Sequence, residues 1–239
     1  MMRVVVTAGP TREHLDPVRF LSNPSTGKMG FAIAAEAARR GHEVVLIAGP
    51  VSLKTPNGVE RVDVVSAREM LEACLDAIRN DELGIRNDGD ANSTIHNSSF
   101  SVQHSSVVFI STAAVADWRP AKCATKKLKK TQMSGMLKLV RNPDILKTIA
   151  KARGRKTGDV RLIGFAAETD HVFQEASRKC RGKGLEFIVA NDVTQKDCGF
   201  GTDTNKVTFV FPDGTFRKFP LMTKRLVARR ILEEIENEK

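Results

Sequence analysis

Short apolar strands alternate with helices along most of this sequence, and this alternation constrains the fold more than any other feature. The predicted strands are short, mostly apolar runs that cover residues 3–7, 43–47, 60–65, 107–111, 160–165 and 186–190. Helical patterns lie between them, over residues 28–40, 67–78 and about 171–182, and again from Asn142 onward. Asn142 is the expected cap of that helix, with Pro143 at its first position. Continuous apolar strands separated by helices indicate a parallel sheet with helices on both faces.

The pattern changes toward the C-terminus. Residues 206–211 and 216–219 flank a Pro-Asp-Gly-Thr turn, which predicts an antiparallel hairpin, and residues 221–236 predict a terminal helix. We therefore expect an α/β fold in one domain over residues 1–239: a Rossmann-like, mostly parallel sheet with helices on both faces and a C-terminal antiparallel hairpin. Residues 80–106 are rich in Asn, Ser, Asp and Gly and predict a surface insertion, because they carry too little apolar surface for a core.

Positive charge is concentrated in one segment. The chain has 38 Lys and Arg against 28 Asp and Glu, a formal charge of +10. Between Asp117 and Asp144 there is no acidic residue, and the basic residues there are Arg119, Lys122, Lys126, Lys127, Lys129, Lys130, Lys138 and Arg141. A second cluster is Arg178, Lys179, Arg181 and Lys183. Residues 119–138 predict either a mobile basic loop that settles on an anion or a solvated loop. Aromatic residues make up only 5% of the chain, which disfavours stacking on single-stranded nucleic acid.

Composition excludes several classes of protein. No apolar run approaches the roughly 18–20 residues that a membrane span needs, so no membrane association is expected. The N-terminus enters a strand at once and shows no signal-peptide pattern. The four cysteines form no CxxC pair, which argues against a zinc framework or a disulfide scaffold. We expect a reduced, cytoplasmic protein.

The carboxyl ends of the predicted strands are unusually small or polar. They read AGPT, AGPV, STAAVAD, GFAAET and ANDV. Ligands of open parallel sheets bind outside these ends, and small residues let a ligand approach the backbone. Tight packing of helices on strands would explain two or three such ends. Five in one chain favour a ligand crevice.

The segment SNPSTGKMG (residues 22–30) directly precedes the first helix. Ser25 or Thr26 can cap that helix, and the glycines leave its N-terminus open to an anion. The segment fits neither a Walker A loop nor GxGxxG, so a nicotinamide cofactor is disfavoured. The candidate anion-binding residues are Ser25, Thr26, Gly27 and Lys28.

Three polar positions could carry chemistry. Asn23 offers an amide that can contact a substrate carboxyl or amide, although Asn before Pro is more often a turn residue. Asp117 could bind a metal, a sugar hydroxyl or a base, or simply pair with a neighbouring lysine. A lysine of the KKLKK run could neutralise developing phosphate charge, and Lys127 is one of the lysines that charge alone leaves open.

Nine segments in order resemble one family. They are TAGPTRE, DPVRF, SNPSTGKMG, AGPVSL, AAVADW, KKLKK, NPDIL, GFAAET and ANDV. Together they are similar to bacterial phosphopantothenoylcysteine synthetases (phosphopantothenate–cysteine ligases), the ligase part of the bifunctional coenzyme A biosynthesis flavoprotein. The resemblance covers nearly the whole chain apart from residues 80–106. It implies that 4′-phosphopantothenate reacts with CTP, with Mg²⁺ screening the triphosphate, to give an acyl-cytidylate that L-cysteine converts to an amide.

The resemblance also implies site residues. Asn23 would contact the activated acyl group and support the cysteine step, and Lys127 would assist acyl-cytidylate formation. The neighbouring Lys126 leaves that second assignment ambiguous by one position. The expected CTP contacts are Ser111, Ala113, Ala114, Asp117, Lys127, Pro143, Asp144, Ile145, Leu146, Phe165, Lys179 and Lys183. Asp117 and the backbone near Ala113 would contact the cytosine and ribose, and the lysines would contact the phosphates.

The family resemblance further implies a homodimer, with the late hairpin in the interface and the partner lending residues to the phosphopantothenate site. A separate phosphopantothenoylcysteine decarboxylase is a further expected partner. Two alternatives stay open: a non-catalytic domain that binds nucleotides or nucleic acid, and the same ligase using ATP. The placement of the charge favours a triphosphate and a phosphorylated acid over nucleic acid.

Overall fold

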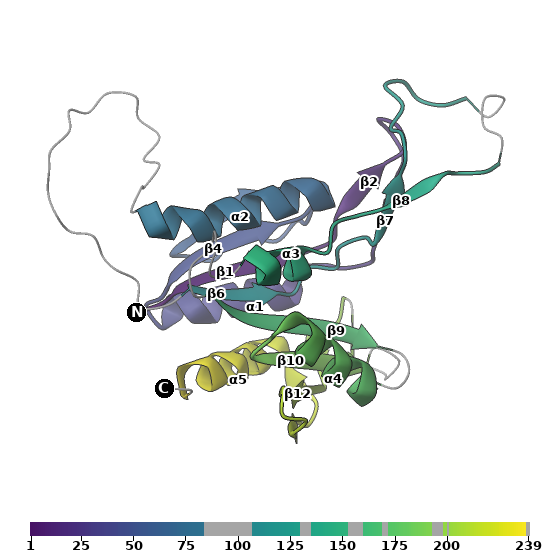
Figure 1. Ribbon diagram of the computed structural model, residues 1–239. Helices are drawn as coiled ribbons and strands as arrows, with labels where there is room; N and C mark the ends of the chain where they lie inside the picture. The colour runs from purple at the N-terminus through teal and green to yellow at the C-terminus, as the bar shows by residue number, and fades with distance from the viewer. Residues whose placement is uncertain are drawn as a thin grey trace, which may run out of the picture.

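The computed structural model describes residues 1–83, 107–129, 135–152, 160–168, 172–192, 198–199 and 201–237. Its central element is an eight-stranded sheet in the order β13-β12-β10-β9-β6-β1-β4-β5 (Figure 1). The bounds are β1 Arg3–Ala8, β4 Glu43–Ala48, β5 Val59–Asp63, β6 Val107–Ser111, β9 Val160–Glu168, β10 Phe187–Asp192, β12 Val207–Val210 and β13 Phe216–Lys218. The strands from β5 to β10 run parallel, whereas β12 and β13 are antiparallel. The expected Rossmann-like sheet with a C-terminal hairpin is confirmed.

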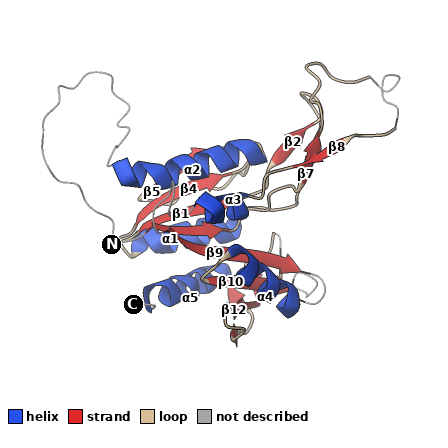
Figure 2. Cartoon of the chain, in the orientation of Figure 1, coloured by secondary structure: helices blue, strands red, loops and turns tan. Residues whose placement is uncertain are grey.

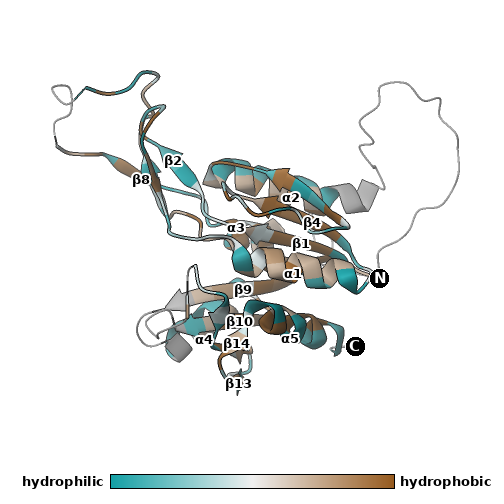
Figure 3. Cartoon of the chain, turned by 180° about the vertical axis from the view of Figure 1, so that it is seen from behind, coloured by the Kyte–Doolittle hydropathy of each residue, from teal (hydrophilic) through white to brown (hydrophobic). Residues whose placement is uncertain are grey.

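Helices cover both faces of this sheet (Figure 2). They are α1 Lys28–Arg39, α2 Ala67–Leu83, α3 Ile145–Ala152, α4 Val172–Lys183 and α5 Lys224–Asn237. Alternate residues of β1 serve the two layers, since Val4 and Val6 pack with α1 and α5 while Val5 packs with α2. In Figure 3 the strands β1 and β4 are correspondingly brown, that is, apolar. Both faces are buried, as the continuous apolar strands required.

Helix α3 begins later than expected. Asp144 caps it, because its Oδ1 accepts a hydrogen bond from the backbone N–H of Lys147 at 2.9 Å. The predicted cap, Asn142, instead donates from Nδ2 to the carbonyl of Ala116 at 2.7 Å. The prediction that Asn142 caps α3 was wrong, because the Asn142 side chain instead connects the segment before α3 to the one that follows β6.

Two small ribbons form an arm that projects from the sheet (Figure 1). Strand β2 (Arg12–His14) pairs with β3 (Phe20–Ser22), and β7 (Trp118–Pro120) pairs with β8 (Leu139–Arg141). The sequence gives no sign of these strands because each has only three residues and most of their side chains are partly or fully exposed. The basic segment 119–138 is therefore not a loop throughout: its two ends continue an antiparallel ribbon. Residues 130–134 lie outside the described residues.

The remaining pair of strands, β11 (Thr204–Asn205) and β14 (Met222–Thr223), leads into α5. Helix α2 extends to Leu83, past the expected start of the insertion, and residues 84–106 lie outside the described part. Within the described residues, no helix combines the length and apolarity needed to cross a bilayer.

Candidate functional site

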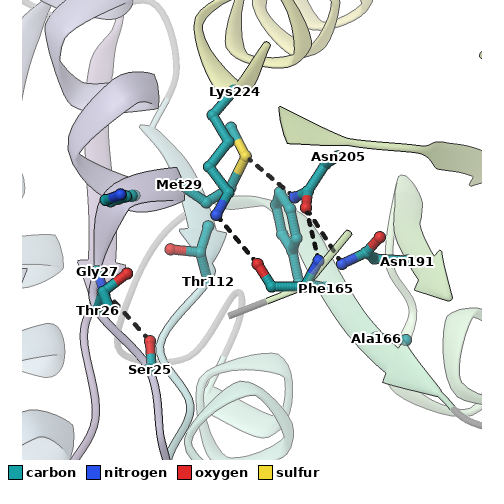
Figure 4. Close-up of a pocket in the computed structure, with 13 residues that line it drawn as sticks. Ser25, Thr26, Gly27, Met29, Thr112, Phe165, Ala166, Asn191, Asn205 and Lys224 are labelled. Carbon is teal, nitrogen blue, oxygen red and sulfur yellow. Dashed lines mark hydrogen bonds between the residues drawn. The ribbon is translucent and has the colours of Figure 1, made fainter. Parts of the chain in front are cut away.

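Two hollows adjoin at the carboxyl ends of the parallel strands. The strand-end crevice has a volume of about 450 Å³ and is lined by Asn23, Ser111, Thr112, Ala113, Ala114, Val115, Ala116, Asp117, Asn142, Pro143, Asp144, Ile145, Leu146, Phe165 and Lys183. The helix pocket has a volume of about 80 Å³ and is lined by Ser25, Thr26, Gly27, Lys28, Met29, Gly30, Thr112, Phe165, Ala166, Asn191, Gly199, Asn205 and Lys224 (Figure 4). Thr112 and Phe165 belong to both linings. A ligand can therefore extend from one hollow into the other.

The strand-end crevice is built from the segment that follows β6. The hydroxyl of Thr112 donates to the carbonyl of Thr7 at 2.6 Å, and the Thr7 hydroxyl accepts from the N–H of Ala113 at 3.2 Å. The N–H of Asn142 donates to the carbonyl of Asp117 at 2.8 Å, which brings the start of α3 beside this segment. The crevice brings together the predicted residues Asn23, Ser111, Ala113, Ala114, Asp117, Pro143, Asp144, Ile145, Leu146, Phe165 and Lys183.

Asn23 lies at the edge of the crevice, and the NH₂ group of its side-chain amide is already hydrogen-bonded. Its Nδ2 donates to the carbonyls of Ala114 and Val115, each at 3.1 Å. Among the described residues no donor reaches Oδ1. The acceptor oxygen of Asn23 is therefore the atom available to a ligand, and it suits an N–H or O–H group.

Lys183 and Asp144 form an ion pair across the crevice. Lys183 Nζ lies 2.7 Å from Asp144 Oδ2 and 3.0 Å from Oδ1. Burial opposes ionisation of Asp144, but hydrogen bonds from Lys183 and from the Lys147 N–H outweigh it and lower the pKa of that carboxyl. Lys183 thus lines the crevice with a counter-ion that an incoming phosphate would have to displace or share, and its contact with a phosphate stays a prediction.

Asp117 lies exposed at the mouth of the crevice. Within the described part of the chain its carboxylate makes no ion pair, so none of the described lysines forms the simple pairing that the sequence allowed. Its backbone carbonyl is engaged by Asn142, which leaves the side chain to solvent or ligand.

Lys127 and Lys179 do not line the crevice. Lys127 is exposed on the arm, next to a tight anchor: Asp16 Oδ2 accepts from the N–H of Leu128 at 3.1 Å, and Arg19 donates to the Leu128 carbonyl at 2.8 Å. The hydrogen bond from Arg19 keeps the pKa of Asp16 well below its usual value, against the effect of burial. Leu128, the neighbour of Lys127, is therefore hydrogen-bonded to the arm. That the basic segment 119–138 moves to an anion stays a prediction.

The helix pocket opens on the N-terminus of α1. Gly27 occupies the cap position at φ 77°, a backbone conformation that favours glycine, and among the described residues no side chain caps the helix. The predicted cap by Ser25 or Thr26 is therefore wrong; Ser25 Oγ accepts only from the N–H of Gly27, at 3.4 Å. The first N–H groups of α1 are left to the pocket, which suits an anion.

Three further residues of the helix pocket come from distant parts of the chain. Lys224 enters from the start of α5, and Asn191 and Asn205 lie opposite α1 (Figure 4). In the sequence analysis Asn191 appears only within the small strand end ANDV, and no pattern singles out Lys224. Only the fold brings it to α1.

A protein-family model for the C-terminal domain of the DNA/pantothenate metabolism flavoprotein matches residues 1–91 and 90–238. The chain belongs to this family. It is 44% identical over 237 residues to the coenzyme A biosynthesis bifunctional protein CoaBC of Escherichia coli, covering 98% of this chain and 51% of that protein. The Bacillus subtilis CoaBC is also 44% identical, over 97% of this chain and 50% of its own length. The chain thus spans about half the length of these curated relatives.

Solved structures share the fold. The crystal structure of the C-terminal domain of CoaBC is 40% identical, with a TM-score of 0.71 over 98% of this chain and 94% of that one. A complex of the Cab2 mutant H337A with phosphopantothenate–cysteine has the same TM-score of 0.71 at 14% identity, over 98% of this chain and 86% of that one, and shows the fold alone. The family resemblance of the nine motifs is confirmed.

Proposed function

We propose that this chain joins 4′-phosphopantothenate to L-cysteine in coenzyme A biosynthesis, consuming CTP through an acyl-cytidylate and releasing pyrophosphate and CMP. The observation that carries the proposal is the pair of adjoining hollows that share Thr112 and Phe165. One is large enough for a nucleotide and the other suits a single phosphate group. The names of the CoaBC relatives support the pathway, and the Cab2 complex, on the same fold, contains phosphopantothenate–cysteine.

The nucleotide would occupy the strand-end crevice. Asp117 and the backbone at Ala113 would contact the cytosine and ribose, while Lys183 would face the phosphates. Lys179, one turn earlier on α4 and outside the crevice lining, would reach only phosphates that extend beyond the crevice. The phosphate of phosphopantothenate would enter the helix pocket, at the open N-terminus of α1 formed by Ser25–Lys28. The acyl end of the substrate would then point toward the shared residue Thr112.

Two bond exchanges follow from this arrangement. In the first, a carboxylate oxygen attacks the α-phosphorus of CTP, and pyrophosphate leaves. In the second, the cysteine amine attacks the acyl carbon, the bond to CMP breaks, and the amine gives a proton to solvent. The Oδ1 acceptor of Asn23 suits the second step, because it can hold and orient an N–H of the attacking amine.

Charge neutralisation in the first step is assigned to Lys127. Its segment begins at the crevice, since Asp117 lines the crevice and β7 follows directly. The assignment requires this segment to close over the triphosphate, because Lys127 is on the arm in the structure. An ammonium brought to the phosphates would stabilise the charge that develops on the leaving pyrophosphate.

Magnesium would enter with the triphosphate. Among the described residues no three His, Cys, Asp or Glu side chains converge on one point. The crevice offers the carboxylates of Asp117 and Asp144, and Asp144 is paired with Lys183. These residues fit a Mg²⁺ that the phosphates hold and one carboxylate assists; the ion would screen the triphosphate charge.

The deciding experiment measures pyrophosphate release from CTP and from ATP, with and without 4′-phosphopantothenate and cysteine. We expect release only with CTP and phosphopantothenate together, and amide only when cysteine is added. Release from ATP at an equal or higher rate would identify the ATP-dependent alternative. No turnover, together with DNA or RNA binding that weakens steeply with salt, would identify a nucleic-acid-binding domain.

A decarboxylase that consumes the amide product is the expected partner activity. The relatives are named bifunctional, and this chain matches about half of their length. Adding a phosphopantothenoylcysteine decarboxylase to the complete reaction should convert the product further, which mass spectrometry would detect as the loss of CO₂.

A further inference from the structure

Lys224 places a buried ammonium group in the helix pocket (Figure 4). The residue is only 7% exposed. Its Nζ donates to the carbonyls of Gly199 at 3.1 Å and Thr202 at 2.5 Å. An ammonium carries three donors, so one N–H remains after these two bonds to described residues.

No carboxylate in the described part of the chain pairs with this ammonium. The nearby carboxylate of Asp203 is taken by Lys28, whose Nζ lies 2.7 Å from its Oδ1. A buried charge that has only carbonyl partners is costly, because carbonyl dipoles replace water but do not neutralise the charge. Burial and the positive charge of Lys28 lower the pKa of Lys224, and Asp203 offsets them only in part.

The other walls of the pocket also lack a partner. The first N–H groups of α1 face it without a cap from any described side chain, because Gly27 occupies the cap position. Opposite them, Asn191 is 8% exposed, and its buried Oδ1 accepts no hydrogen bond within the described residues. A ligand with anionic oxygens and a hydroxyl would satisfy the helix N–H groups, the ammonium and the amide oxygen together.

We propose that Lys224 is the counter-charge for the terminal phosphate monoester of the acid substrate and makes the enzyme select phosphorylated over unphosphorylated pantothenate. This role rests on the proposed function for the identity of the substrate. The pocket itself points to a small anion with several oxygens, and the proposed substrate identifies that anion as a phosphate monoester. Lys224 contacts the end of the substrate remote from the reacting carboxylate, so it acts on binding and selectivity.

Lys224 and Lys28 also hold the same loop. Lys28 Nζ donates to the carbonyl of Gly201 at 2.8 Å, and Lys224 holds the carbonyls of Gly199 and Thr202 on either side. Both lysines therefore hold described residues of this loop beside the pocket. A purely structural role in holding this loop is the competing explanation that the test has to separate.

The test compares Lys224→Met, which removes the charge, with Lys224→Arg, which keeps it. Arg225→Met is the matched control, because Arg225 is the exposed neighbour on α5. For Lys224→Met we expect the KM for phosphopantothenate to rise at least about 10-fold, with kcat and the KM for CTP changed less than about 3-fold. Activity on unphosphorylated pantothenate should stay nearly constant, so the preference for the phosphorylated acid falls by the same factor. Lys224→Arg should keep most of that preference.

Equal losses on pantothenate and phosphopantothenate would overturn the proposal and indicate a structural role. An unchanged KM in a folded Lys224→Met variant would overturn it as well.

Binding of inorganic phosphate tests the site apart from turnover. Titration calorimetry should detect binding of inorganic phosphate, in competition with phosphopantothenate, in the wild type and in Arg225→Met. In Lys224→Met this phosphate binding should be lost. If the wild type binds phosphate but turns nothing over, the proposed function fails while the anion site stands.

A spectroscopic measurement covers the case in which Lys224→Met does not fold. In the wild type labelled with ¹⁵N at lysine side chains, the Nζ signal that disappears in Lys224→Arg should shift on phosphate addition. Phosphate binding that leaves this signal unmoved would refute the role of Lys224.

Discussion

Single polar atoms decide what each hollow can bind. Asn23 donates both of its side-chain N–H groups to the carbonyls of Ala114 and Val115, so only its acceptor oxygen is available in the crevice. Lys183 reaches the crevice already paired with Asp144. The helix pocket instead presents donors, namely the first N–H groups of α1 and the ammonium of Lys224. The helix pocket therefore carries a cation without a carboxylate partner among the described residues, whereas the cation of the crevice is paired.

Replacing Asn23 should separate the two chemical steps. In Asn23→Asp, a carboxylate faces the carbonyls of Ala114 and Val115 without N–H groups to give them, and the acceptor is displaced. We expect the acyl-cytidylate to form while its conversion to amide slows at least about 100-fold. Quenched samples analysed by mass spectrometry should show the cytidylate. Asn57→Asp, at an exposed turn, is the control. Failure to trap any cytidylate would contradict the assignment.

Adjacent lysines allow a matched test of the first step. Lys127→Gln should slow pyrophosphate release at least about 100-fold while CTP affinity falls only a few-fold, because the charge acts on the leaving group more than on the bound nucleotide. Lys126→Gln, one residue away and equally exposed, should have a much smaller effect. A larger loss in the Lys126 variant would shift the assignment by one residue.

At the scale of elements, close contact between α1 and β1 shapes the helix pocket. A Cβ on Gly30 would lie 2.6 Å from Ala8 Cβ and 2.6 Å from Thr112 Oγ1. Only glycine therefore lets the start of α1 lie directly on the ends of β1 and β6. The same contact brings the helix N-terminus to Thr112, where the two hollows meet.

Gly30→Ala should push α1 away from the sheet. We expect a loss of roughly 1–3 kcal/mol in the free energy of unfolding and a raised KM for phosphopantothenate, since the wall of the helix pocket moves. Gly182→Ala in α4, where a Cβ would meet nothing within 4 Å, should be neutral or stabilising. Urea denaturation and steady-state kinetics measure the two effects. Equal stability in both variants would contradict the close-contact explanation.

A charged cluster joins α1 to α5. Glu36 of α1 accepts hydrogen bonds from Arg39 and Arg40, and Arg40 also reaches Glu236 of α5. The hydrogen bond from Arg39 lowers the pKa of the buried Glu36 to about 2, against the effect of burial and with further help from Arg40. Because the pKa is lower in the folded state, the stabilisation is present above about pH 4.5 and is lost as the pH falls toward 2.

The loss of unfolding free energy caused by Glu36→Gln should therefore depend on pH. At pH 7 we expect the free energy of unfolding to fall by roughly 2–3 kcal/mol, since one pKa unit corresponds to about 1.4 kcal/mol. The difference from the wild type should shrink as the pH drops from 4.5 toward 2. Urea denaturation at pH 7, 4.5 and 3 measures it, with the exposed Glu60→Gln as control. A difference that stayed constant with pH would contradict this origin.

At the scale of the whole molecule, the arm carries a cluster of exposed apolar side chains. Its exposed apolar side chains are Val18, Phe20, Trp118, Met136, Leu137 and Leu139. On the late hairpin, which the family resemblance places in the dimer interface, Phe216 is exposed. A cluster of exposed apolar residues on one projecting element is typical of an interaction surface.

We predict a homodimer joined through the arm. Val18→Asp should shift the chain from dimer to monomer in sedimentation velocity, because a carboxylate would be buried in an apolar interface. Phe216→Asp tests the expected contribution of the hairpin and should weaken the dimer less. Dissociation by Phe216→Asp alone would refute the arm and favour the hairpin.

The sequence by itself determined the parallel sheet, the covering helices and a crevice at the strand ends, while the individual residues Asp144, Leu146 and Lys183 were implied by the family resemblance. It could do so because apolar runs, helical periodicity and small strand ends are local patterns, and parallel strands bring their carboxyl ends to one edge. The short strands β2, β3, β7 and β8 left no such pattern. The cap of α3 passed from Asn142 to Asp144 because a carbonyl more than 20 residues away, that of Ala116, engaged the asparagine amide.

Only the tertiary structure decided what faces the N-terminus of α1. Lys224 lines the same pocket as Gly27 and Lys28, although almost the whole chain separates them in sequence. Its hydrogen-bond partners are backbone carbonyls of a loop that has no motif. The same holds for the anchor of Lys127 on the arm by Asp16 and Arg19. The physical reason is that local patterns report which residues are buried along one element, whereas contacts between distant side chains depend on how the elements come together. The sequence predicted the anion pocket from one helix end, and the fold supplied the charge opposite it.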